Sequence, residues 1–101
     1  MLRILPEARD DDVEAASWYD REKLGLGDRL LDEIDRALAP IENAPQSFAR
    51  WEPYDGIDEI RRFVLKRFPF VIIFLCRLDE VVVIAVAHAS RRPELWLDRI
   101  G

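Results

Sequence analysis

Residues able to do acid–base or anion-binding chemistry gather in the C-terminal part of this sequence. His88 is the single histidine. The cationic side chains that could act with it are Arg61, Arg62, Lys66, Arg67, Arg91 and Arg92. An imidazole exchanges a proton near neutral pH, and guanidinium groups hold phosphates and carboxylates through paired hydrogen bonds. This combination suits two kinds of site, one that cleaves an RNA phosphodiester and one that binds an anionic partner.

Part of this set also has structural explanations. His88 ends a predicted strand, so its ring can hydrogen-bond within the turn 89–93, besides the possible roles in catalysis and partner contact. Arg91 and Arg92 stand just before Pro93, which stiffens the chain and presents their donors to a carboxylate or phosphate. The alternative for this arginine pair is a solvated surface position. Both interpretations stay open at this stage.

The basic residues lie on, between or just after three apolar segments, which are predicted to form strands over 60–66, 70–77 and 81–88. Links of only a few residues join these segments, which favours an antiparallel meander. The middle segment is apolar on both faces and is expected to be the central, most buried strand. Because adjacent residues of a strand point to opposite faces, at most one of Arg61 and Arg62 belongs to an open face of the sheet.

Two helices are predicted before these strands. A short first strand over 2–5 is followed by a helix expected from about residue 10 to 24, where Asp11 and Glu14 have the spacing of a capping box. The segment 25–27, Gly-Leu-Gly, then gives the backbone the freedom that a tight turn between helices needs. The two helices are therefore expected to form an antiparallel hairpin.

The second helix has the clearer pattern. From Asp28 onward, apolar residues recur every three or four positions, with charged residues on the other side. These apolar residues are Leu30, Leu31, Ile34, Leu38 and Ile41. Pro40 is expected to kink or stop the helix, because it lacks a backbone donor and crowds the preceding turn. Carboxylates around Asp32 to Asp35 are the expected partners of whichever of Arg61 and Arg62 turns toward the helices.

The predicted fold class is α+β, with residues 1–101 as a single domain. An N-terminal strand and an antiparallel two-helix hairpin precede the sheet, which is mainly antiparallel and has three to five strands. The hairpin covers one sheet face, and the other face is expected to stay open, with the basic residues on it or at its rim. The C-terminal segment 93–100 is expected to form one helical turn or a short tail that packs Trp96 back onto the sheet.

Composition limits the classes of function. The net charge is −5, but residues 1–59 carry seven Lys and Arg against sixteen Asp and Glu, whereas residues 60–101 carry eight against four. An acidic protein is a poor general binder of nucleic acid, although a local basic face can still meet an anionic partner. The single cysteine, Cys76, excludes an internal disulfide and a cysteine-based zinc site. The apolar runs are too short to cross a membrane, so we expect a cytoplasmic protein without metal or cofactor.

Three stretches of the chain resemble the toxins of the RelE/ParE superfamily. The stretch 83–96 is similar to the closing motif of these toxins, which is an apolar strand followed by His, basic residues, Pro and an aromatic residue. Ser17-Trp18-Tyr19 followed by the glycines of 25–27 resembles their helix hairpin, and 61–70 resembles their middle strands. The resemblance spans nearly the whole chain, with the motifs in the same order.

The resemblance implies a toxin of a type II toxin–antitoxin system, held in a hetero-oligomer by an antitoxin whose C-terminal segment wraps it. Members of the superfamily either cleave mRNA on the ribosome or inhibit DNA gyrase by binding, and they arrest growth or stabilise plasmids. Similar nucleases carry a phosphate-gripping arginine near the start of the strand that begins here at Phe68, and they end in histidine or tyrosine chemistry that Ser90 and Arg91 do not reproduce. The resemblance therefore favours a ParE-like toxin that binds gyrase.

On this interpretation, the expected residues for binding antitoxin or target are Arg61, Arg62, Arg67, His88, Arg91, Arg92 and Trp96. The alternative is a ribosome-dependent endoribonuclease, and its catalytic residues would be Arg62, Lys66, Arg67 and His88. A third hypothesis is a toxin fold that has lost toxicity and serves as a protein-binding module. The acidic net charge of the chain supports this hypothesis.

Overall fold

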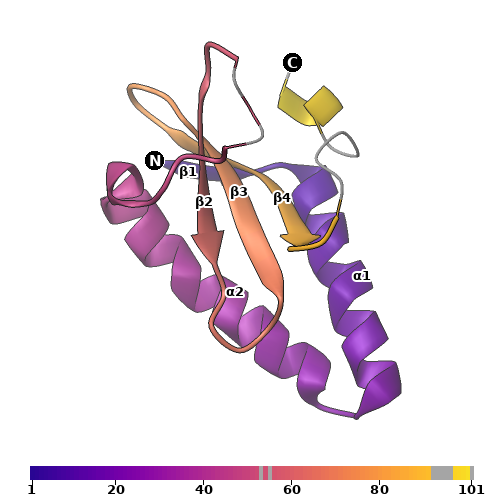
Figure 1. Ribbon diagram of the computed structural model, residues 1–101. Coiled ribbons are helices and arrows are strands. Elements are labelled where there is room, and N and C mark those ends of the chain that lie inside the picture. The colour runs from indigo at the N-terminus through magenta and orange to yellow at the C-terminus, as the bar shows by residue number, and fades with distance from the viewer. Residues whose placement is uncertain (53, 55, 92–96, 101) are drawn as a thin grey trace.

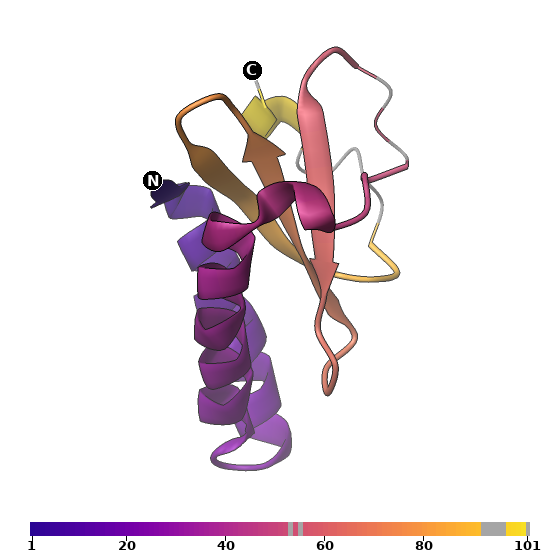
Figure 2. The same ribbon diagram turned by 90° about the vertical axis from the view of Figure 1, so that its left-hand side faces the viewer.

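The structure, a computed structural model, describes residues 1–52, 54, 56–91 and 97–100. It has two layers, with both helices on one side of a four-stranded sheet (Figures 1 and 2). The strands are β1 (Leu2–Ile4), β2 (Glu59–Val64), β3 (Phe70–Cys76) and β4 (Val81–His88). This arrangement confirms the predicted α+β class.

Helix α1 (Pro6–Glu22) begins earlier than the sequence pattern indicated. Pro6 occupies the start of the helix, where a missing backbone donor costs nothing. The predicted capping box at Asp11 and Glu14 is therefore wrong, because both residues lie inside the helix. The buried residues of α1 are mostly small, and Val13 points outward with 64% of its surface exposed.

Helix α2 (Leu26–Asn43) continues through Pro40, so the predicted stop at this residue is wrong. Pro40 lies in the last turn, where only its own donor is lost, and its carbonyl still accepts from Ala44 N–H at 3.0 Å. The predicted apolar side of this helix is the buried one, since Leu30, Ile34 and Ile41 are buried. A short 3-10 turn, η1 (Pro45–Ser47), follows α2.

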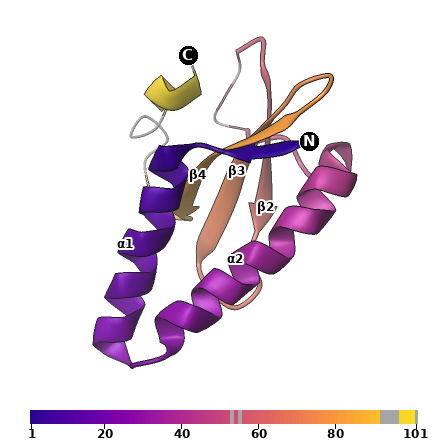
Figure 3. The ribbon, with the colours of Figure 1, turned by 180° about the vertical axis from the view of Figure 1, so that it is seen from behind.

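The two helices diverge from a tight connecting turn (Figure 3). Asp20 of α1 holds this turn, because its Oδ1 accepts from Gly25 N–H at 3.2 Å and from Gly27 N–H at 2.8 Å. Gly25 has a φ of 95°, in the left-handed region that favours glycine. Gly27 lies at a close contact between α1 and α2, since a Cβ there would collide with the Ala16 carbonyl and lie 2.8 Å from the Asp20 carboxylate.

Replacing Gly27 with alanine is therefore expected to lower the free energy of unfolding by about 2 kcal/mol, the usual cost of forcing a methyl group into a packed site. Urea denaturation of the variant and the wild type measures this cost. Ala39→Ser is the matched control, because it also adds one heavy atom to the same helix but at an exposed position. Equal stability of Gly27→Ala and wild type would contradict the close helix contact.

The sheet has the strand order β1-β4-β3-β2. β2, β3 and β4 form the predicted antiparallel meander, and β1 adds a parallel edge strand along Val81–Val83 of β4. β3 is central, as the sequence indicated. The register shifts within the β3–β4 ladder, where Ile73 pairs with Ala85 and Phe74 with Val83, so that Ile84 has no partner. Such a bulge locally increases the twist of the sheet.

Both sheet faces are buried, so the prediction of one open face is wrong. Beneath the helices lie side chains such as Ile72 and Phe74. The opposite face has its own core, formed by Ile60, Ile73, Leu75, Val82, Ile84 and Ala85 with Trp51. Tyr54 and the C-terminal 3-10 turn η3 (Leu97–Ile100) pack against this second core. The reason is the apolar run in β3 and β4, which leaves no polar face to meet water.

The C-terminal turn agrees with the predicted return of the chain to the sheet, although the contact is made by Leu97 and Ile100. The predicted packing of Trp96 lies outside the described residues. No helix within the described ranges is long and apolar enough to cross a membrane.

Candidate functional site: a groove between α1 and β4

A groove of about 620 Å³ runs between α1 and the edge of β4. Ring and methyl groups form much of its wall, and charged groups stand at its rim. Its lining comprises Asp11, Glu14, Ala15, Trp18, Tyr19 and Arg21 of α1, Phe70 of β3, and Val86, Ala87, His88, Ser90, Arg91 and Arg99. Two of the residues predicted for binding, His88 and Arg91, therefore face the same groove.

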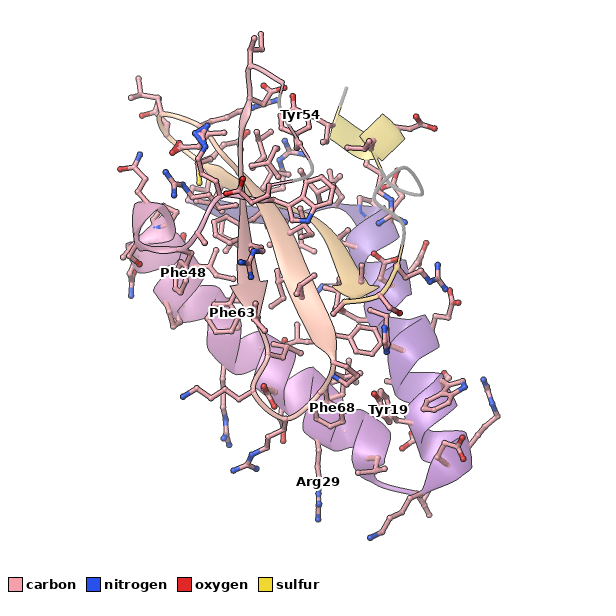
Figure 4. All side chains as sticks on the ribbon, in the orientation of Figure 1. Tyr19, Arg29, Phe48, Tyr54, Phe63 and Phe68 are labelled. Carbon is pink, nitrogen blue, oxygen red and sulfur yellow. The ribbon has the colours of Figure 1, made fainter. Side chains whose placement is uncertain are left out.

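Aromatic rings form one end of the groove. Tyr19 lies edge-on to Phe68, with ring centroids 5.0 Å apart (Figure 4). Tyr19 also lies edge-on to Phe70 at 6.1 Å and to Trp18 at 5.0 Å. Trp18 is 49% exposed, whereas the rings of Tyr19, Phe68 and Phe70 are partly buried. A half-exposed indole beside a groove offers a large apolar surface to a partner.

His88 orders the turn that closes β4. Its Nδ1 accepts from Ser90 N–H at 3.1 Å and lies 2.8 Å from Ser90 Oγ, and its carbonyl accepts from Arg91 N–H at 2.9 Å. Its ring stands edge-on to Phe70, with centroids 5.4 Å apart. Because these contacts use Nδ1, the atom left for a partner in the groove is Nε2.

The rim of the groove carries unpaired cations. Among the described residues, Arg21 and Arg91 form no ion pair, and both side chains are exposed. Asp11 of the lining pairs with Arg99, whereas Glu14 forms no ion pair with any residue that the structure describes. The groove therefore offers an apolar wall with a cationic border, which suits a segment that has both apolar and acidic side chains.

The unpaired edge of β4 forms the floor of the groove at its other end. Asp11 Oδ2 accepts from Val86 N–H at 3.0 Å, and Arg99 Nη1 donates to Ile84 O at 3.1 Å. The two side chains also pair with each other at 2.7 Å. The sequence analysis assigned no role to Arg99, because an arginine in a C-terminal tail has no signal that names its partner.

Arg61 and Arg62 point to opposite sides of the sheet, as predicted, but the expected helix carboxylates pair with neither. Arg61 donates from Nε and Nη2 to Glu59 Oε1 at 3.0 and 2.7 Å and from Nη1 to Phe48 O at 2.6 Å. A carboxylate on its own strand is closer than the helix. Arg62 lies opposite Ile73, on the face away from the helices, and forms no ion pair with the described residues.

Lys66 and Arg67 belong to the turn between β2 and β3. The helix carboxylate that reaches this region is Glu33, whose Oε2 accepts from the backbone N–H groups of Lys66 at 2.6 Å and Arg67 at 3.3 Å. Glu33 of α2 therefore holds the backbone of the turn, and the side chains of Lys66 and Arg67 remain exposed.

The residues proposed for a nuclease do not gather at one place. His88 lies opposite Phe70 on the helix side of the sheet, whereas Arg62 lies opposite Ile73 on the other side. Lys66, which sits in the turn, is not part of the groove lining. The predicted binding residues Arg92 and Trp96 lie outside the described residues.

Comparisons with known proteins agree with this fold. The family model for the ParE toxin of the type II toxin–antitoxin system parDE matches residues 2–93. A solved structure of a chromosomal ParDE toxin–antitoxin system from P. aeruginosa is similar, with a TM-score of 0.72 and 19% identity, and the match covers 86% of this chain and 92% of that one. Comparison with curated protein sequences gives no match. Because the family model spans nearly the whole chain, this protein belongs to the ParE toxins of type II toxin–antitoxin systems.

Proposed function

We propose that this ParE-type toxin acts in the cytoplasm by binding DNA gyrase, and that a cognate antitoxin neutralises it by occupying the α1–β4 groove in a hetero-oligomer. The observation that carries the proposal is the groove itself, an apolar trough of about 620 Å³ bordered by unpaired arginines. The membership of the chain in a toxin–antitoxin family supports an antitoxin partner.

The groove is suited to a peptide segment rather than to a small metabolite. It is long enough to take in residues of α1 from Asp11 to Arg21, which is almost three helical turns. Trp18 and Tyr19 would contact apolar side chains of the segment, and Arg21 and Arg91 its carboxylates. The antitoxin would in this way compete with a target that binds the same surface of the free toxin.

Action by binding is favoured over catalysis because the candidate catalytic groups are separated. Cleavage of RNA needs a base for the 2′-hydroxyl and cations on the same phosphate. Arg62 and His88 lie on opposite faces of the sheet, and Nδ1 of His88 is engaged with Ser90. The endoribonuclease therefore remains the second candidate, supported only by the exposed Lys66 and Arg67 near the end of β4 that carries His88.

Two assays with the purified toxin separate these functions. We expect inhibition of gyrase-catalysed supercoiling, with ribosome-bound mRNA left intact, and we expect the co-purified antitoxin to abolish the inhibition. Inducing the chain alone in a bacterium should arrest growth. Cleaved mRNA with normal supercoiling would establish the endoribonuclease instead, and normal growth would leave the non-toxic binding module.

A further inference from the structure

The edge of β4 is closed by side chains instead of by a strand. β1 pairs only with Val81–Val83, and no other described strand lies beside β4 on that side. Beyond this point, Asp11 and Arg99 hold the edge: one accepts from Val86 N–H at 3.0 Å and the other donates to Ile84 O at 3.1 Å. We call this pair of side chains the clasp.

The clasp supplies the hydrogen bonds that a neighbouring strand would supply. A strand offers a carbonyl to Val86 N–H and an N–H to Ile84 O, and here a carboxylate and a guanidinium take these two places. The clasp is also a paired unit, because Arg99 Nη1 lies 2.7 Å from Asp11 Oδ2 and Nη2 lies 3.2 Å from Asp11 Oδ1. Both side chains are about four-fifths buried, so water competes weakly for them.

The clasp joins segments from the two ends of the chain. Asp11 is on α1, and Arg99 is on η3, which lies beside the N-terminal half of α1 and β4 (Figures 1 and 3). Leu97 and Ile100 of the same turn pack on the second core of the sheet. The ion pair therefore also anchors η3, and opening it would loosen this turn from the sheet.

We propose that the clasp gates the groove: an acidic, extended segment of the antitoxin pairs with β4 along Ile84–Val86 only after Arg99 releases this edge. This inference rests on the proposed function and describes how the antitoxin reaches its binding site. Val86, Asp11 and Arg99 all line the groove, so a segment lying there reaches the edge directly. When the segment takes the backbone groups of β4, the freed guanidinium of Arg99 pairs with one of its carboxylates.

Two measurements on Arg99→Ala test the gate. In the free protein, hydrogen exchange at the Val86 amide should become about tenfold faster, because the carboxylate of Asp11 loses the group that orients it. The association rate constant with the co-purified antitoxin, measured by stopped flow, should rise about tenfold, because opening no longer precedes binding. In the complex, the Val86 amide should be protected in both proteins.

Arg36→Ala is the matched control, since it removes an exposed arginine of α2 that lines neither the groove nor the second pocket beside Arg99. Its association rate should equal that of the wild type. If Arg99→Ala fails to fold, Asp11→Asn keeps an acceptor for Val86 N–H, removes the charge of the pair, and should shift the rate in the same direction.

An association rate unchanged by opening the clasp, or a Val86 amide that exchanges freely in the complex, would overturn the gate while leaving antitoxin binding intact. Absence of any binding by the wild type is a different result, which would overturn the proposed function and the gate with it.

Discussion

At pH 7.5, replacing Asp12 with asparagine is expected to raise the free energy of unfolding by roughly 2 kcal/mol. Asp12 lies on α1, facing α2, and only 3% of its surface is exposed. Its Oδ2 accepts from Arg9 Nη1 at 3.1 Å, whereas Oδ1 has no hydrogen-bond partner among the described residues. A buried carboxylate with one unsatisfied oxygen destabilises the folded state in its charged form.

The pH dependence follows from the direction of the pKa shift. Burial raises the pKa of Asp12 from 3.8 to about 6, against the opposing influence of Arg9. Because the folded protein binds this proton more tightly than the unfolded chain, Asp12 costs nothing well below pH 3.8. Its cost grows as the pH rises from 3.8 to 6 and is complete above 6. The stability difference between Asp12→Asn and wild type should therefore change by roughly 2 to 3 kcal/mol between pH 4 and pH 7.5.

Urea denaturation at four pH values in this range measures the difference directly. Other carboxylates titrate in both proteins, so their contributions cancel in the comparison. Asp10→Asn, an exposed carboxylate on the same helix, is the matched control and should show a difference that does not vary with pH by more than a few tenths of a kcal/mol. A constant difference for Asp12→Asn would mean that the charge of this buried group carries no penalty.

The elements could be predicted from the sequence because their signals are local. The alternation and length of the apolar runs gave β4 its bounds, Val81–His88, and the spacing of Leu30, Ile34 and Ile41 gave α2 its buried side. The second core was missed for the opposite reason. What covers the far face of the sheet, Trp51 and the turn at Leu97, comes from segments without regular periodicity, and only tertiary packing brings them there.

The site was predictable only in part. His88 and Arg91 could be found because they follow directly after a strand, so their place at one end of it is fixed by the chain. The partners of Arg61 and Asp11 could not be found. Asp11 has the spacing of a helix cap, but the chain enters α1 five residues earlier at Pro6, and this shift turns the carboxylate toward the edge of β4. Register and helix start decide such contacts, and neither is encoded by residue type alone.

Replacing Trp18 with alanine is expected to weaken antitoxin binding about 100-fold, which corresponds to about 2.7 kcal/mol. Trp18 lines the groove and is 49% exposed, so about half of its surface is available for burial by a partner. Indole rings that become buried in an interface contribute more than most residues, because they bury a large area at low entropic cost. Isothermal titration with the antitoxin measures the loss.

Val13→Ala is the matched control. Val13 lies on the same helix and is 64% exposed, but it is not part of the groove lining. Its removal should leave the affinity within about twofold of the wild type, and Trp18→Phe should retain part of the binding because it keeps an aromatic ring. Since Trp18 also contacts Tyr19, the unfolding of each variant is followed in parallel, so that a loss of affinity in a fully folded protein reports the interface. If Trp18→Ala and Val13→Ala bind equally well, the antitoxin does not lie in this groove.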